Sequence, residues 1–178
     1  IYPMSNNNYG KIFWITGLSG SGKSTIGEKL NTLINKKFGK TIIIHGDDIR
    51  DIYKFKFYSK AKRLGLAKAN SDLCNLLSKN GINVIFTTVG LFKELFNYNR
   101  KNLINYTEIF IKTDIKKLLK NKTKSFYKVK TKNVWGIDIK AEFPENPHIV
   151  IENNFDSSTS KLAYILYKKI TSLKNKKY

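Results

Sequence analysis

The fold of this chain is decided by residues 17–24, Gly17-Leu18-Ser19-Gly20-Ser21-Gly22-Lys23-Ser24. Two glycines five positions apart, followed by a lysine and a hydroxyl residue, form the phosphate-loop pattern (P-loop). The apolar run at 12–15 predicts a short buried strand before it, and apolar residues at helical spacing over 25–36 predict a helix after it. Strand, glycine-rich loop and helix therefore follow in the order that a nucleoside triphosphate site requires.

The residue types of this stretch suit a bound polyphosphate better than a plain Gly/Ser surface turn, which needs neither the Lys-Ser pair nor the flanking elements. Glycines let backbone N–H groups converge on phosphate oxygens, and the helix N-terminus adds partial positive charge. Lys23 is expected to reach the β- and γ-phosphates, and the Ser24 hydroxyl to hold Mg²⁺. The predicted cofactor-binding residues are Gly17, Ser19, Gly20, Ser21, Gly22, Lys23, Ser24 and Thr25.

Length and composition point to one domain. The 178 residues, 41% of them hydrophobic, suffice for a single core, so we expect one α/β domain over 11–175 after a disordered or tag-derived lead at 1–10. No stretch approaches the roughly 20 apolar residues of a membrane span, and no signal peptide precedes the domain, which predicts a cytoplasmic protein without a membrane partner. Cys74 is the only cysteine and is assigned to packing.

Strand-like and helix-like segments alternate along the rest of the chain. Short apolar runs recur at 41–44, 82–86, 109–111 and 149–151, and helical spacing of apolar residues recurs at 67–77, 114–119 and 158–173. This alternation predicts an α/β P-loop NTPase fold, with a parallel sheet of about five strands and helices on both faces. In such sheets ligands bind beyond the carboxyl ends of the strands.

Polar residues stand at those carboxyl ends. Asp47 and Arg50 follow the strand at 41–44, and Thr88 follows the strand at 82–86, so all three are expected near the P-loop. A phosphoryl-transfer site needs a carboxylate to orient or deprotonate the attacking hydroxyl, or to hold a water on Mg²⁺. Asp47 is the candidate for both tasks. No acidic residue closes the strand at 82–86, which favours Asp47 as the carboxylate on the magnesium side. Asp48 is a rival, and either could instead cap a helix.

The formal charge of +20 raises a second hypothesis, a nucleotide-dependent nucleic-acid binder. Dispersed lysines and the lack of a recognition module weigh against it, so no nucleic-acid partner is expected. The densest basic run, 112–132, is compatible with an RNA-facing strip, a solvated face or a mobile lid that meets phosphate. We favour a mobile basic lid at about 120–143.

Three segments, 17–24, 46–50 and Phe143-Pro144-Glu145-Asn146-Pro147, resemble the adenylylsulfate (APS) kinase family in order and spacing over nearly the whole chain. The resemblance implies a P-loop kinase with a mobile lid, which transfers the γ-phosphate of MgATP to the 3′-hydroxyl of a small-molecule nucleotide acceptor. It also implies a possible homodimer, since members of this family often form dimers.

The resemblance also implies roles for individual residues. Lys23 and Asp47 become the catalytic residues, with Asp47 near the acceptor 3′-hydroxyl and, together with Ser24, on the magnesium side. Arg50 and Arg63 match arginines that approach the acceptor. The substrate-binding residues implied in this way are Asp47, Arg50, Tyr58, Arg63, Thr88, Lys132, Val134 and Trp135.

Departures from the family pattern lie on the acceptor side. His45 stands where the family has the first Asp of Asp-Gly-Asp, Leu66 replaces an Asn, and Val134 replaces a Phe that would stack on adenine. A stacked base contributes about 1–3 kcal/mol, so a different base is expected unless Trp135 or Tyr58 compensates. The branch of the family that phosphorylates cytidine diphosphoramidate fits this pattern, and adenylylsulfate is the alternative acceptor. A third possibility is a kinase for a sugar or a nucleoside monophosphate.

Overall fold

The computed structural model describes residues 8–54, 59–120 and 141–173. The predictions for Tyr58, Lys132, Val134 and Trp135, and for nearly all of the lid at 120–143, lie outside these residues.

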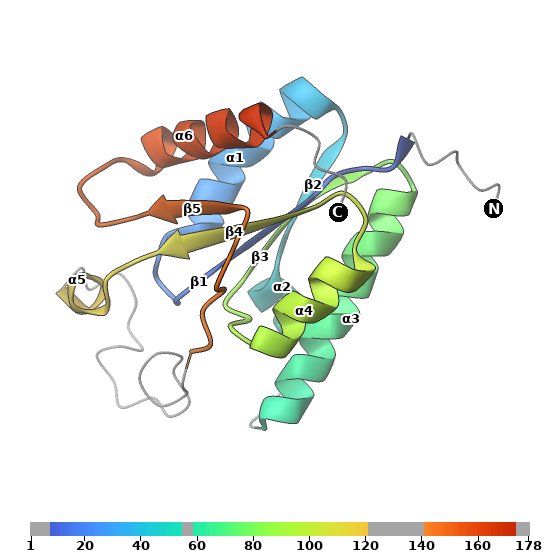
Figure 1. Ribbon diagram of the computed structural model, residues 1–178, viewed down its shortest axis with the longest axis horizontal. Helices are drawn as coiled ribbons and strands as arrows, with labels where there is room; N and C mark the ends of the chain where they lie inside the picture. The colour runs from blue at the N-terminus through green and yellow to red at the C-terminus, as the bar shows by residue number, and fades with distance from the viewer. Residues whose placement is uncertain (1–7, 55–58, 121–140, 174–178) are drawn as a thin grey trace.

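A five-stranded parallel sheet forms the centre of the molecule (Figure 1). The strand order is β2-β3-β1-β4-β5, with β1 at Ile12–Gly17, β2 at Thr41–His45, β3 at Asn83–Thr88, β4 at Tyr106–Lys112 and β5 at Ile149–Glu152. The P-loop strand β1 lies in the middle, paired with β3 on one side and β4 on the other. The predicted α/β fold and parallel sheet are confirmed.

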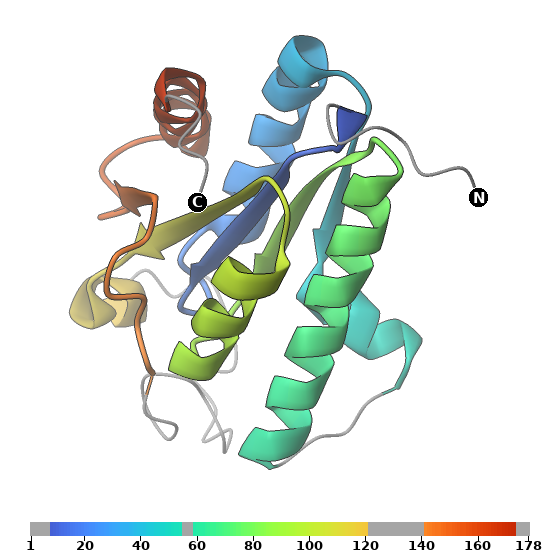
Figure 2. The same ribbon diagram turned by 45° about the vertical axis from the view of Figure 1, so that its right-hand side comes forward.

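Helices cover both faces of the sheet, as Figure 2 shows. The helices α1 (Lys23–Phe38) and α6 (Thr159–Ser172) pack on one face, and α3 (Lys60–Lys79) and α4 (Lys93–Asn102) pack on the other. Two short helices follow strands: α2 (Gly46–Ile52) begins at the residue after β2, and α5 (Ile115–Lys120) begins three residues after the end of β4. Because the sheet is parallel, the carboxyl ends of β1, β2 and β3 lie together at one edge of it.

The strand β1 is buried on both faces, which explains its continuous apolar run. Successive side chains point to opposite faces, so Phe13 and Ile15 join the core beneath α1 and α6. Ile12 and Trp14 join the core beneath α3 and α4. The Trp14 ring stacks on Phe86 of β3, with ring centroids 4.5 Å apart. This packing holds the strand that leads into the P-loop rigidly in place.

The structure differs from the sequence expectations at three places. The helix α3 begins at Lys60, seven residues before the predicted start at residue 67. Ser59 caps the helix by accepting a hydrogen bond from the Lys62 N–H. The helix α4 was not predicted. The expected lead at 1–10 is too long, because Gly10 is buried and its N–H donates to Ser78 O at 2.8 Å. Among the described residues, no helix combines the length and the apolar character needed to cross a membrane.

Candidate functional site

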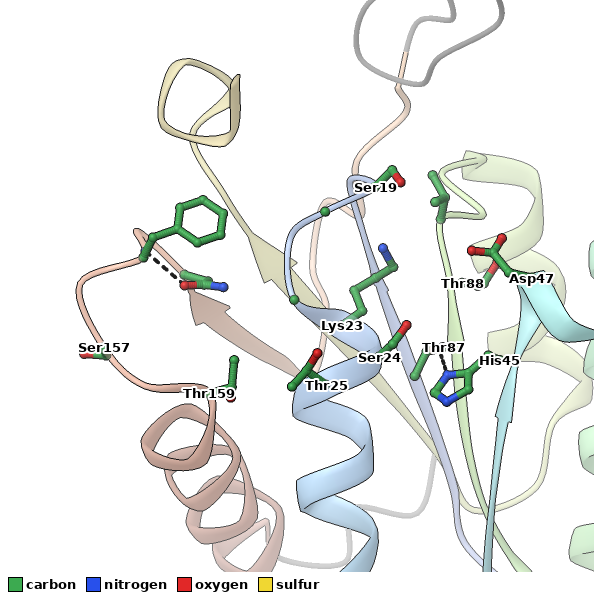
Figure 3. A pocket seen from close by; sticks show the side chains of 15 residues that line it. Ser19, Lys23, Ser24, Thr25, His45, Asp47, Thr87, Thr88, Ser157 and Thr159 are labelled. Atoms are coloured by element: carbon green, nitrogen blue, oxygen red, sulfur yellow. Dashed lines mark hydrogen bonds between the residues drawn. The ribbon is translucent and has the colours of Figure 1, made fainter. Parts of the chain in front are cut away.

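A cavity of about 430 Å³ opens at the carboxyl edge of the sheet (Figure 3). Its lining comes from three parts of the chain: the P-loop with the start of α1, the ends of β2 and β3, and the segment between β5 and α6. These parts contribute Ser19, Gly20, Gly22, Lys23, Ser24 and Thr25; His45, Asp47, Thr87, Thr88 and Val89; and Asn153, Phe155, Ser157 and Thr159.

The start of α1 presents the two P-loop side chains with predicted roles. Lys23 is buried, and its Nζ donates a hydrogen bond to Leu18 O at 2.8 Å, within the P-loop. In Figure 3 its ammonium group points into the space between the P-loop and the side that carries Asp47 and Thr88, and the Ser24 hydroxyl lies below it. The structure therefore brings Lys23, Ser24, Asp47 and Thr88 together around one cavity.

Two predicted cofactor-binding residues, Gly17 and Ser21, do not line the cavity. A Cβ atom at Gly17 would lie 2.5 Å from Ile111 O, so this glycine permits close packing of the loop on β4. The Ser21 side chain is fully buried, and its Oγ has no hydrogen-bond partner among the residues that the structure describes. Both residues shape the loop. Their predicted contact with a nucleotide stays a prediction.

Asp47 and Arg50, which lie one turn apart on α2, pair with each other. The Arg50 Nη2 atom is 3.1 Å from Asp47 Oδ1, and both side chains are more than half exposed. Only Asp47 reaches the cavity lining. The carboxylate thus faces the cavity with a guanidinium group beside it.

Arg63, on the first turn of α3, is partly buried. Its pKa is lowered by burial and by the positive charge of Arg50. Its Nε atom is buried and has no hydrogen-bond partner within the described part of the chain. Two guanidinium groups from α2 and α3 are therefore near each other beside Asp47, an arrangement that an anionic ligand would stabilise.

His45, at the carboxyl end of β2, fills one wall of the cavity. Its Nδ1 atom lies 2.7 Å from Thr87 Oγ1 at the end of β3, and its Nε2 atom lies 3.6 Å from Glu28 Oε1 on α1 (Figure 3 draws the first contact). The imidazole is thus held between two strands and a helix, at the position where the family pattern has an aspartate.

Sequence reasoning missed the third part of the lining, Asn153, Phe155, Ser157 and Thr159. A signal was available, because these residues follow β5 and the carboxyl ends of parallel strands meet at one edge of the sheet. No conspicuous motif marks them, and the polar run around them looks like an ordinary loop.

The donor set of the cavity fits Mg²⁺. This ion keeps several waters, takes substrate phosphate oxygens, and needs only one or two carboxylate or hydroxyl ligands from the protein. Ser24 and Asp47 offer those ligands from facing walls of the cavity. Within the described ranges, no cluster of three or more His, Cys, Asp or Glu side chains forms a metal site of its own. The arrangement suits a metal ion that arrives with a nucleotide.

Comparison with known proteins agrees with this geometry. A cytidine diphosphoramidate kinase from Campylobacter jejuni is 36% identical over 94% of this chain and 99% of its own length. A probable adenylyl-sulfate kinase from Aeropyrum pernix is 29% identical over 88% of this chain and 90% of its own length. The Mycobacterium tuberculosis APS kinase in complex with AMPPNP and APS shares the fold, with a TM-score of 0.82, 24% identity and coverage of 92% of this chain and 99% of that one.

The sequence model of the adenylylsulphate kinase family matches residues 9–152. This match spans the P-loop and all five strands, and it ends with the last residue of β5. The chain therefore belongs to the adenylylsulphate kinase family, P-loop kinases that transfer phosphate to an alcohol group.

Proposed function

We propose that this chain transfers the γ-phosphate of MgATP to the ribose 3′-hydroxyl of cytidine diphosphoramidate. The observation that carries the proposal is the 36% identity, over nearly the full length of both chains, to a cytidine diphosphoramidate kinase. The altered acceptor wall supports it, because His45 lines the cavity where the family pattern has an aspartate. A pocket retuned in this way suits an acceptor other than adenylylsulfate.

The donor end of the cavity would bind the triphosphate. The P-loop backbone would surround the β-phosphate, and Lys23 would exchange its hydrogen bond to Leu18 O for phosphate oxygens. Ser24 and Asp47 would hold the Mg²⁺ that accompanies ATP, and the bound ion would neutralise charge on the β- and γ-phosphates. Lys23 stabilises the charge that develops on the leaving ADP.

The acceptor end would bind the nucleotide that receives the phosphate. Asp47 would accept the hydrogen bond of the 3′-hydroxyl and orient it in line with the γ-phosphorus. Arg50 and Arg63 would hold the 5′ phosphate oxygens, because the guanidinium fork pairs two oxygens at once. Arg50 contacts Asp47 in the structure, so a bound acceptor phosphate would compete with Asp47 for Arg50.

Adenylylsulfate is the second candidate acceptor. The family match and the 29% identity to a probable adenylyl-sulfate kinase favour it.

We also propose that the enzyme works in the cytoplasm, where ATP is supplied, and that it forms a homodimer. Light scattering would measure the mass of the assembly.

The test offers purified protein cytidine diphosphoramidate and adenylylsulfate in parallel and follows MgATP-dependent ADP release. Phosphorus NMR then locates the new phosphate on the product. We expect preferential 3′-phosphorylation of the cytidine compound. Turnover of adenylylsulfate with none of the cytidine compound would contradict the proposed acceptor and assign the chain to the second one.

A further inference from the structure

Asn153 connects two walls of the cavity that come from distant parts of the chain. It follows β5 directly, and its backbone N–H donates to Lys112 O at 2.9 Å, which extends the β4–β5 pairing by one residue. Its side chain is buried, with 3% of its surface exposed, and lies among the cavity-lining residues. An asparagine side chain in such a place must find partners for its amide.

Both ends of the Asn153 side chain are engaged. The Nδ2 atom donates to Ser21 O in the P-loop at 2.9 Å, and this hydrogen bond is buried. The Oδ1 atom accepts from the Phe155 N–H at 3.0 Å. One amide therefore links the P-loop to the segment that lines the opposite wall.

The hydrogen bond to Ser21 O sets the direction of a peptide plane. In a trans peptide the carbonyl oxygen and the following N–H point to opposite sides, and no peptide bond in the described chain is cis. With Ser21 O directed at Asn153, the Gly22 N–H points away from it and is available to a phosphate oxygen in the cavity that Gly22 lines. The contact is also close, because a Cβ atom at Gly22 would lie 2.9 Å from Asn153 Nδ2.

The other hydrogen bond stabilises an unfavourable backbone conformation. Phe155 has φ 63°, in the left-handed region, where the side chain of an L-residue crowds the following carbonyl oxygen. Phe155 lines the cavity and also packs against the apolar cluster that includes Leu18 of the P-loop. Asn153 thus holds both the loop that would bind phosphate and the turn that forms the facing wall.

We propose that Asn153 is a positioning residue that fixes the P-loop in its phosphate-binding shape and couples it to the Phe155 wall. The inference rests on the proposed donor site and deepens it. It assigns the phosphate affinity of residues 17–24 partly to a side chain that follows β5.

The test compares two ligands in competition titrations: AMPPNP, which would contact both walls, and inorganic tripolyphosphate, which would contact the P-loop alone. For Asn153→Ala we expect both affinities to fall roughly tenfold, as loss of a buried hydrogen bond and its geometry implies. Asn154→Ala is the matched control, since Asn154 is the adjacent asparagine and does not line the cavity.

The outcomes separate coupling from local packing. If Asn153 only supported the Phe155 turn, Asn153→Ala would weaken AMPPNP and leave tripolyphosphate unchanged, which would overturn the proposal. The proposal would also be overturned if tripolyphosphate did not compete with AMPPNP in the unaltered protein, because the proposal requires a P-loop that already has its phosphate-binding shape. Absence of AMPPNP binding in the unaltered protein would instead contradict the proposed function.

A second variant keeps the inference testable if Asn153→Ala unfolds. Asn153→Asp keeps an oxygen that can accept the Phe155 N–H but removes the Nδ2 donor to Ser21 O, so it should weaken tripolyphosphate binding in the same way. A folded Asn153→Asp variant that bound tripolyphosphate with unchanged affinity would overturn the proposal.

Discussion

The ammonium group of Lys23 lies in the loop that would bind the phosphates, where it donates a hydrogen bond to Leu18 O. We expect Lys23→Ala to lower kcat at least about 100-fold, because charge on the leaving ADP loses its main side-chain partner. ADP release measures the effect, and thermal unfolding checks the fold. Lys29→Ala, an exposed position on the same helix, serves as the control. A Lys23 variant with normal kcat would contradict the assignment of the donor site.

Arg63 offers a separate test of the acceptor side. We expect Arg63→Ala to raise the KM for the acceptor about tenfold or more while the KM for ATP stays unchanged, since a charge-assisted hydrogen bond contributes about 1.5–3 kcal/mol. Arg63→Lys should still have a raised KM for the acceptor, because lysine lacks the guanidinium fork. Lys62→Ala, at an exposed neighbouring position, is the control. An equal rise in both KM values would place Arg63 outside the acceptor site.

The position of a residue beside the cavity was predictable from the sequence where a motif or a strand end marked it. Lys23, Ser24, Asp47 and Thr88 all line the cavity, as their positions after β1, after β2 and at the end of β3 indicate. Asn153 was not predictable, because its importance depends on a hydrogen bond to Ser21 O, far away in the sequence. No local pattern records such a contact.

At the scale of elements, one ion pair fixes α4 to the sheet. Arg100 of α4 donates to Glu108 of β4 through Nε at 3.1 Å and Nη2 at 2.8 Å; the Glu108 side chain is fully buried, and the Arg100 side chain is 37% exposed. We expect Arg100→Leu to lower the free energy of unfolding by about 1.5–3 kcal/mol, because it removes charge-assisted hydrogen bonds from a buried carboxylate, which keeps its contact with Tyr106. Urea unfolding measures this, and adding Glu108→Leu should recover most of the loss. No recovery would mean that Arg100 acts through packing alone.

The segment before β5 has a pH-dependent contact with β4. His148 Nδ1 accepts the Glu108 N–H at 2.7 Å, and burial lowers the pKa of His148 below its ordinary value of 6.5. A lowered histidine pKa means that the folded state favours the neutral imidazole. The contribution of His148 to folding stability is therefore complete above the pKa of the unfolded state, and it is lost as the pH falls below that value. Stability should therefore fall as the pH drops through 6.5, the ordinary pKa of histidine, toward the lower folded-state pKa.

Urea unfolding across that pH range measures the effect. His148→Asn is the matched control, because asparagine can still accept the N–H but does not titrate. A control with the same pH slope as the unaltered protein would assign the slope to other groups.

Element prediction succeeded where apolar residues were frequent and failed where they were few. The helix α4 contains three asparagines and only two adjacent apolar residues, Leu95 and Phe96, so it is too polar overall to stand out in the sequence as a core-packed helix. Tertiary contacts stabilise it instead: the Arg100–Glu108 pair, and the hydrogen bond from Ser71 Oγ to Asn99 Oδ1 at 2.6 Å. Such contacts become visible only when β4 and α3 are in place.

At the scale of the whole molecule, the charge of +20 opposes compactness. We expect the free energy of unfolding to rise as NaCl increases from about 20 mM to about 300 mM, because screening weakens repulsion among the dispersed lysines. Repeating the series with Lys23→Ala separates general screening from anion binding in the P-loop. A flat or falling series would mean that local ion pairs already offset the repulsion.

The fold class was predictable because buried parallel strands have continuous apolar runs and their connections are right-handed. The order of the strands was not predictable, since the apolar pattern of β1 does not indicate which strands pair with it.

The contact between Asn153 and the P-loop has a consequence for biosynthesis. Asn153, which holds Ser21 O, leaves the ribosome more than a hundred residues after the P-loop. Because a domain generally folds as a unit, the nascent chain carries its nucleotide motif over that interval without the side chain proposed to fix it. Affinity for ATP should therefore arise only after β5 and Asn153 have been made.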